Sequence, residues 1–220
     1  MEPIIRAQSI PEWTVGILFV SLGLLAMSKW AFEQRHSSFL NLLNDNSYIF
    51  VFNKKKAYLH PFHWTWNLFA ILNTSLFFYL STGLGFENQA YLSNGAIHYG
   101  PLLVVVAGFV ILKPLLQNFH GWLFGNQKIL KEIFFKKSSY FNYANVVLFT
   151  ANIFFVFISP NSKVLFYSAL FLFLMVMLIG WVVVLRNYQK YLLEHLFYFI
   201  LYLCALEIAP FLIIASIFNS

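Results

Sequence analysis

The sequence contains long stretches of apolar residues, each close to the length that a helix needs to cross a lipid bilayer. Such a helix requires about 20 mostly apolar residues, because the hydrocarbon core is about 30 Å thick. Six stretches meet or approach this length, at residues 13–32, 64–85, 99–125, 143–158, 163–185 and 195–218. We therefore predict an all-α fold: one integral-membrane domain over residues 1–220, a polytopic bundle of about six transmembrane helices.

The composition also favours a membrane protein over a soluble domain. Hydrophobic residues make up 60% of the 220 residues and charged residues only 10%, whereas soluble domains contain about 25% charged residues. The single cysteine, Cys204, excludes an intrachain disulfide and a cysteine-based metal site. The N-terminus lacks the basic region of a signal peptide, so we expect the first apolar stretch to be retained as a helix.

The basic residues are distributed unequally between the two sides of the predicted membrane. The side with both termini and the second and fourth loops carries only Arg6 and Lys163. The first, third and fifth loops carry Arg35, Lys54, Lys55, Lys56, Lys128, Lys131, Lys136, Lys137, Arg186 and Lys190. The positive-inside rule predicts that these loops are cytoplasmic and that both termini are periplasmic, across the inner membrane of a bacterium. The net charge of +6 therefore does not indicate a nucleic-acid partner.

Two of the basic loops also contain aromatic residues. Lys54, Lys55 and Lys56 follow the run "YIFVF", and we expect them to contact anionic lipid headgroups as a general anchor, at about 1 kcal/mol per basic residue. In "NQKILKEIFFKK", apolar and charged residues fall on opposite arcs of a helix. This pattern predicts an amphipathic helix that lies in the headgroup layer.

Polar side chains inside the predicted spans should point toward the interior of the bundle, because lipid offers them no hydrogen-bond partner. For the uncharged side chains we expect bonds between helices, each worth about 0.6–2 kcal/mol. Residues that share a face within one span are Ser21 with Ser28, Asn67 with Thr74, Lys113 with Gln117 and His120, and Asn145 with Asn152.

Lys113 and Glu207 are formal charges that lie well inside predicted spans. With the span starts and ends given above, Lys113 lies about 21 Å and Glu207 about 16 Å from the same membrane surface. We therefore predict that they form a buried pair near the midplane; alternatively, burial keeps Glu207 protonated. Each stands next to a helix-kinking proline, Pro114 or Pro210, whose freed carbonyls could complete an ion or proton site.

The histidines of "HPFHWTW", His60 and His63, suggest a metal site together with His36, but no Cys, Asp or Glu nearby completes a plausible ligand set. We interpret them as interfacial residues beside Trp64 and Trp66. Nucleophile-elbow, P-loop and dinucleotide-binding motifs are absent from the sequence. We therefore expect no metal, no cofactor and no catalytic residue.

Three segments, "GFVILKPLLQNFHGWLF", "SSYFNYANVVLF" and "FYFILYLCALEIAPFLI", resemble an uncharacterised multi-pass membrane family of Bacteroidota that is classified as a domain of unknown function. The resemblance covers most of the chain. It implies an inner-membrane location and draws attention to Lys113 and Glu207, and it supplies no catalytic residue.

Two hypotheses for the function follow from these observations. The first is a non-enzymatic subunit or scaffold of an inner-membrane envelope complex, with the bilayer and other membrane subunits as partners. The second is a small carrier or channel for protons, an ion or a lipid-linked substrate, which uses the site at Lys113 and Glu207. An integral-membrane enzyme ranks third, because Glu207, His120 and the loop histidines are too sparse to define a reaction. The short loops and the lack of a catalytic motif favour the first hypothesis.

Overall fold

A computed structural model of the chain describes residues 11–42, 60–82, 95–123, 127–158 and 162–188. The predicted sixth span lies outside these ranges, and so do Glu207, Pro210, Lys54, Lys55 and Lys56. Within the described ranges all regular secondary structure is helical, which confirms the predicted all-α class.

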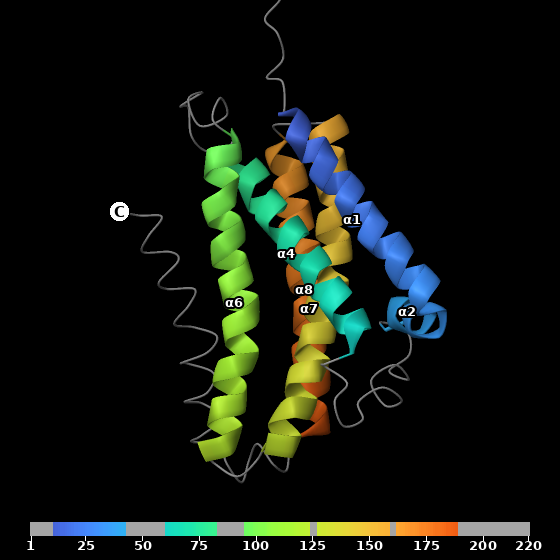
Figure 1. The fold of residues 1–220 in the computed structure, drawn as a ribbon, viewed down its shortest axis with the longest axis vertical. Helices are drawn as coiled ribbons and strands as arrows, with labels where there is room; N and C mark the ends of the chain where they lie inside the picture. The colour runs from blue at the N-terminus through green and yellow to red at the C-terminus, as the bar shows by residue number, and fades with distance from the viewer. Residues whose placement is uncertain (1–10, 43–59, 83–94, 124–126, 159–161, 189–220) are drawn as a thin grey trace, which may run out of the picture.

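The described helices form an elongated bundle (Figure 1). They are α1 (Glu12–Ala31), α2 (Glu33–Leu40), α4 (Pro61–Thr82), α6 (Gly95–Leu123), α7 (Gln127–Phe157) and α8 (Lys163–Asn187). Segments of α1, α6, α7 and α8 are long and apolar enough to cross a membrane. This result agrees with a membrane protein, and the bounds of α1 and α8 lie within two residues of the predicted spans.

Helix α4 occupies the centre of the bundle and packs against α1, α6 and α7 (Figure 1). Most of its side chains are buried, including polar ones such as Asn73, Thr74 and Ser75. Its neighbours therefore separate much of α4 from the surroundings. This position accommodates the polar side chains of α4, because they face protein rather than lipid.

Aromatic side chains of α4 form much of the core. The ring of Trp66 lies 4.3 Å from that of Phe39, which follows α1 in the chain, and the ring of Phe69 lies 5.5 Å from that of Phe149 on α7. Tilted and edge-on ring pairs of this kind contribute about 0.5–1.5 kcal/mol each beyond the area that they bury. The aromatic residues of α4 thus connect the first part of the chain with α7.

Helix α7 corrects two predictions. We expected a short span at residues 143–158, preceded by a separate amphipathic helix in the headgroup layer. The structure has one helix of 31 residues from Gln127 to Phe157. The segment contains neither glycine nor proline, so nothing in it interrupts a helix. Lys136, which we placed on the charged arc of that helix, is only 4% exposed, and the adjacent Lys137 is 7% exposed.

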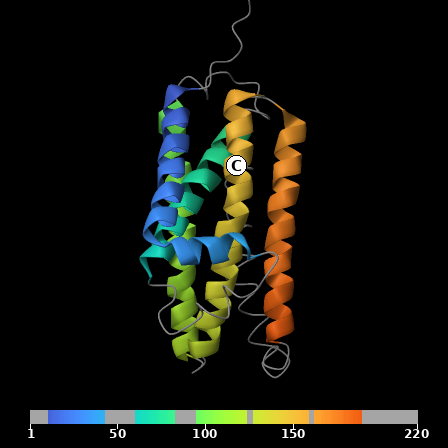
Figure 2. The ribbon, with the colours of Figure 1, turned by 90° about the vertical axis from the view of Figure 1, so that its right-hand side faces the viewer.

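Helix α2 was not predicted, because its residues were placed in the first loop. It begins directly after Phe32, whose φ of −140° ends α1. Figure 2 shows α2 running across the direction of α7 and α8. His36 and Phe39 are buried on its inner face, against Trp66 of α4. This apolar contact holds a helix that is too short to be stable alone.

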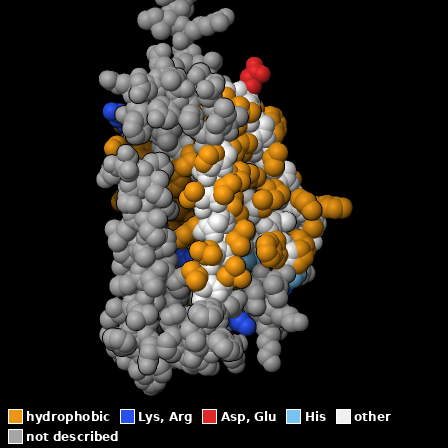
Figure 3. Space-filling view, turned by 60° about the vertical axis from the view of Figure 1, so that its left-hand side comes forward, with side chains coloured by type: hydrophobic (Ala, Val, Ile, Leu, Met, Phe, Trp, Pro, Cys, Tyr) orange, Lys and Arg blue, Asp and Glu red, His pale blue; other side chains and the backbone are white. Residues whose placement is uncertain are grey.

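Helix α8 packs mainly on α7 and exposes large hydrophobic side chains along its length, among them Tyr167, Phe171 and Leu178. Exposed hydrophobic side chains also cover the described face in Figure 3. Helices α7 and α8 approach each other closely at Gly180. A Cβ atom added there would lie 2.6 Å from Cγ of Tyr140, so only glycine fits without a shift of one helix.

We predict that Gly180→Ala lowers the melting temperature of the detergent-solubilised protein, because the new methyl group overlaps the buried ring of Tyr140. Gly108→Ala on α6 is the matched control, since no atom lies within 4 Å of the added Cβ. In that variant the higher helix propensity of alanine should keep or raise stability by up to about 1 kcal/mol. Equal melting temperatures for the two variants would contradict the close approach at Gly180.

Candidate functional site

Polar side chains of α4 and α7 meet in the interior of the bundle. We call this group the amide seam; it consists of Asn67, Asn73 and Thr74 of α4 and Asn142, Asn145 and Asn152 of α7. Five of these six side chains are buried, Asn67 being half-buried. The amide seam contains no titratable group, so the chemistry that it offers is hydrogen bonding.

Three hydrogen bonds join the two helices along the amide seam. Thr74 donates to Oδ1 of Asn145 at 2.7 Å, and Asn142 donates through Nδ2 to Oδ1 of Asn67 at 3.0 Å. Asn152 donates through Nδ2 to the backbone carbonyl of Asn73, also at 3.0 Å. Each contact includes at least one residue of the predicted polar faces, and the bond of Thr74 with Asn145 joins two of them.

Helix α1 joins the amide seam through one further contact. Asn73 donates through Nδ2 to the hydroxyl of Ser21 at 3.2 Å and to the carbonyl of Phe69 at 2.8 Å. Ser28, which shares a helix face with Ser21 in the sequence, instead contacts Nδ1 of His36 at 2.8 Å. The side chain of Ser28 therefore connects α1 to α2 rather than to α4.

Sequence analysis missed Asn73 and Asn142. Asn142 was excluded because the fourth span was expected to begin one residue later, although it lies three residues before Asn145 and thus on the same helix face. Asn73 directly precedes Thr74, so a polar face of ordinary width would have included it. The spacing signal was present in both cases, and the assumed span boundary or face width removed it.

The amide seam is rich in acceptors. Within the described part of the chain, Oδ1 of Asn73, Asn142 and Asn152 has no hydrogen-bond partner. An unsatisfied buried acceptor costs about 1–3 kcal/mol, which offsets much of what the bonds contribute. We infer that the amide seam determines which helices pair, and in which register, more than it adds to net stability.

Side-chain contacts near the N-terminal end of α4 bring α4, α7 and α8 together at one level along the bundle. Nε2 of His63, in the first turn of α4, lies 3.0 Å from the hydroxyl of Ser138 on α7. The adjacent Lys137 places its ammonium nitrogen 3.3 Å from the ring centroid of Trp181 on α8. We call the level along the bundle at which His63, Lys137, Ser138 and Trp181 lie the boundary level.

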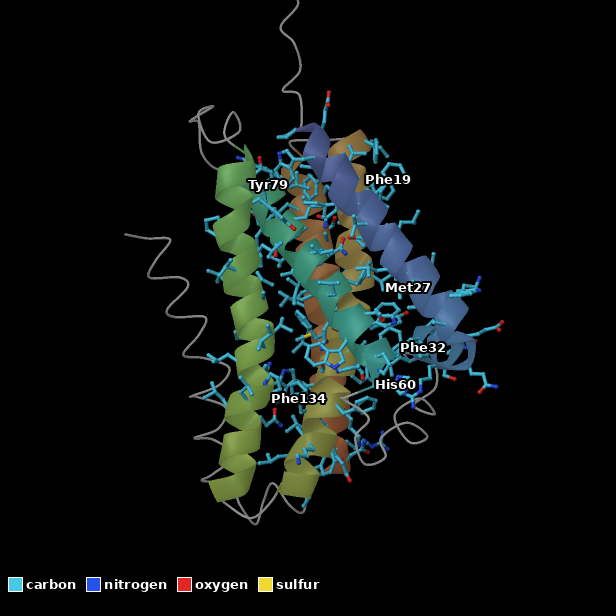
Figure 4. The ribbon with its side chains drawn as sticks, viewed as in Figure 1. Phe19, Met27, Phe32, His60, Tyr79 and Phe134 are labelled. Atoms are coloured by element: carbon cyan, nitrogen blue, oxygen red, sulfur yellow. The ribbon has the colours of Figure 1, made fainter. Side chains whose placement is uncertain are left out.

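The end of α1 lies at the boundary level too. Phe32, which follows α1, packs edge-on against His60, which precedes α4, with ring centroids 5.1 Å apart. Figure 4 shows the two side chains together where α2 approaches α4, whereas Phe19 and Met27 lie on the outer side of α1. The end of α1 and the start of α4 are therefore neighbours.

The helices run similar lengths from the boundary level to the opposite end of the bundle. At 1.5 Å per residue, α1 and α4 are about 30 Å long, α7 runs about 30 Å from Lys137 to Phe157, and α8 runs about 27 Å from Trp181 back to Lys163. These lengths match the thickness of about 30 Å of a hydrocarbon core. The boundary level therefore fits one surface of that core.

Lys113 on α6 lies near the boundary level. Gln117 donates through Nε2 to the carbonyl of Leu130 on α7 at 2.6 Å. Since α6 and α7 run antiparallel (Figure 1), Lys113, four residues before Gln117, is level with about residue 134, one turn from Lys137. Helix α6 begins at Gly95, four residues before the predicted start of the third span, whereas its apolar segment, Tyr99–Gln117, begins at the predicted residue.

The remaining predicted features of α6 have different outcomes. The helix continues through Pro114 to Leu123, and the ammonium nitrogen of Lys113 lies 5.4 Å from the ring centroid of Phe109. The side chain of His120 lies outside the described residues, so its predicted common face with Gln117 is not tested. The pair of Lys113 with Glu207 also stays a prediction, since Glu207 is not described.

The histidines near the boundary level are held by individual contacts. Nδ1 of His60 accepts a hydrogen bond from the backbone N–H of Phe62 at 3.2 Å. Burial and the nearby Arg35 lower the pKa of His60, and burial and Lys29 lower the pKa of His36. The described residues hold no group of three or more His, Cys, Asp or Glu side chains suited to a metal ion.

The structure also shows how basic residues of α7 are accommodated beside α8. The ammonium nitrogen of Lys136 lies 4.6 Å from the ring centroid of Tyr188, and the Tyr188 hydroxyl donates to Oε2 of Glu132 at 3.0 Å. Together with the contact of Lys137 to Trp181, these interactions join the ends of α7 and α8. Lysines and an aromatic ring at the edge of a hydrocarbon core are a common membrane-interface arrangement.

Comparison with known proteins identifies the family. The model of the family described as "Domain of unknown function (DUF4271)" matches residues 14–218, and with this coverage the chain belongs to that family. No curated protein and no solved structure matches the chain. The family description assigns no activity, so the function has to be argued from the residues and their geometry.

We predict that Thr74→Val and Asn145→Leu are energetically coupled, because each removes one partner of the same buried hydrogen bond. Each variant should lose about 0.6–2 kcal/mol of stability in detergent, and the double variant should lose less than the sum. Thr150→Val is the matched control, since the exposed hydroxyl of Thr150 bonds only the carbonyl of Val146 in its own helix. Additive losses would show that the bond does not join the helices.

Proposed function

We propose that the chain is a non-enzymatic subunit or scaffold of a complex in the bacterial inner membrane, with the bilayer and other membrane subunits as its partners. The observation that carries this proposal is the mutual pairing of the polar side chains in the amide seam. Polar groups that bond one another across α1, α4 and α7 are engaged in helix packing. The three Oδ1 atoms that lack a partner among the described residues belong to asparagines whose amide nitrogens are bonded in this way, and none of the residues of the amide seam carries a charge.

The ends of α6, α7 and α8 provide a surface for a partner subunit. Helix α7 extends about 15 Å beyond the boundary level, from Lys137 back to Gln127. The headgroup layer is only about 5–7 Å thick, so this extension reaches the water. The bond from Gln117 to Leu130 and the bond from Tyr188 to Glu132 stiffen it.

The proposal includes six membrane-spanning helices with both termini in the periplasm. The boundary level supports this orientation, because described basic residues gather at it or beyond it: Lys29, Arg35, Lys113, Lys131, Lys136, Lys137 and Arg186. The opposite end has Lys163. Basic residues favour the cytoplasmic side, so the boundary level is the cytoplasmic surface in this proposal.

The alternative is a carrier for protons, an ion or a lipid-linked substrate with a midplane site at Lys113 and Glu207. Its motivation was the similar depth of the two residues. Lys113 is level with about residue 134 of α7, near the boundary level, whereas the midplane lies about 15 Å from that level. The position of Lys113 therefore weighs against the carrier.

Copurification of the full chain from native membranes in mild detergent tests the scaffold. We expect at least one membrane protein to copurify in a fixed ratio. Replacement of Lys131 by Glu, on the extension of α7, should weaken that association, whereas Lys163→Glu at the opposite end should leave it unchanged. A chain that purifies alone, and that conducts protons or ions in proteoliposomes, would refute the scaffold and establish the carrier.

A further inference from the structure

Helix α6 packs against the bundle less tightly than the other outer helices do. Helices α1 and α8 each have four buried residues along their length, namely Thr14, Leu18, Ser21 and Ser28 on α1 and Ala169, Val176, Gly180 and Val184 on α8. In α6, no residue from 100 to 116 is buried. A helix with few buried apolar contacts has low local stability, so it can move without disturbing the core.

The contacts of α6 with the core are concentrated near its beginning. The ring of Tyr99 lies 5.1 Å from that of Trp13 on α1 and 6.2 Å from that of Tyr79 on α4. Leu102 and Leu103 pack against the same core. Figure 1 shows why these contacts do not continue: α4 runs obliquely, so that its C-terminal end lies beside α6 and its start lies away from it. The beginning of α6 is therefore its anchored end.

The opposite end of α6 is held to α7 by a side-chain hydrogen bond. Nε2 of Gln117 donates to the carbonyl of Leu130 at 2.6 Å, and the Gln117 side chain is buried. Residues 102–112, which lie between the anchored end and Gln117, contain no polar side chain. When such an apolar stretch leaves a protein surface in a bilayer, it meets lipid tails that are equally apolar, so its separation costs little.

A glycine and a proline lie at the anchored end of α6. Pro101 lacks the backbone N–H that would bond the carbonyl of Ile97, and proline and glycine are common causes of helix kinks. A Cβ atom added at Gly100 would have no atom within 4 Å, so packing does not fix this point. Gln117 lies about 24 Å along the helix from Pro101, and a change of about 20° in a kink there would move it by about 8 Å.

We propose that α6 is a hinged helix, which pivots about Gly100 and Pro101 and is held closed by the hydrogen bond of Gln117 with Leu130. In the open form, the end of α6 near the boundary level moves away from α7 into the bilayer, while Tyr99 stays in the core. The opening gives the membrane access to the side of α7 that α6 covers. This inference goes beyond the scaffold function and does not depend on it.

Distances between spin labels on the full chain in nanodiscs test the hinge. One pair of labels, at Leu112→Cys on α6 and Leu172→Cys on α8, reports on the moving end. The control pair, at Met27→Cys on α1 and Leu172→Cys, joins two helices that have buried residues along their length. All three positions are exposed, and the background is Cys204→Ser. We expect two distances for the α6 pair and one distance for the control pair.

Two variants should shift the α6 pair in opposite directions. Gln117→Met removes the amide and keeps the length of the side chain, so the ratio of open to closed molecules should rise about 3- to 30-fold, the equivalent of about 0.6–2 kcal/mol. In this variant, Pro101→Ala restores the N–H for Ile97 and should lower the ratio again. Pro114→Ala is the matched control, because a kink at Pro114 lies beyond the label at 112 and does not move it.

The outcomes that would overturn the hinge are specific. One is a single distance for the α6 pair in both the original chain and the Gln117→Met variant. The other is an equal effect of Pro101→Ala and Pro114→Ala. If Gln117→Met folds poorly, Gln117→Asn takes its place, because it keeps a polar amide that is too short to reach Leu130.

Discussion

Hydrogen bonding between α4 and α7 is the interaction on which the rest of the bundle depends. Helix α4 crosses the bundle with its amide and hydroxyl groups bonded to partners on α7 and α1. Once these partners are fixed, the aromatic rings of α4 contact the end of the first chain segment and α7. The helices that remain outside, α6 and α8, can then be apolar on their exposed sides.

The amide seam also determines how α4 and α7 are aligned along the long axis of the bundle. With α4 fixed on α7, His63 meets Ser138, and the lysines of α7 meet the aromatic rings of α8 at the same end. Because of this alignment, about 30 Å of helix lies between the boundary level and the opposite end of the bundle. Lys113 lies near this level, because Gln117, one turn further along α6, donates to the carbonyl of Leu130 on α7.

The sequence predicted the helical class and the approximate positions of the described long helices, since apolar length alone carries that information. It also predicted that Thr74 and Asn145 would face other helices. It could not predict that residues 127–142 belong to the same helix as the fourth span, because the charges at Lys136 and Lys137 indicate a separate helix in the headgroup layer until the rings of Tyr188 and Trp181 are placed beside them. Long-range partners of this kind have no signature in local spacing.

The short helix α2 was missed for a related reason. Its eight residues are mostly polar, and only the contact of Phe39 with Trp66, distant in the sequence, makes the helix stable. Helix α6 begins four residues before the predicted start of the third span. Each of these differences comes from the position of an element boundary, which depends on tertiary contacts more than element type does.

The depth of α6 in a bilayer tests the central claim most directly. Spin labels at Leu112→Cys and Val105→Cys, in a Cys204→Ser background, lie on the exposed side of α6 two turns apart and leave Lys113 in place. In proteoliposomes, the account predicts that the label at 112 collides readily with a water-soluble nickel reagent, while the label at 105 collides with oxygen alone. Equal protection of both positions from nickel would place Lys113 in the membrane interior and contradict the account.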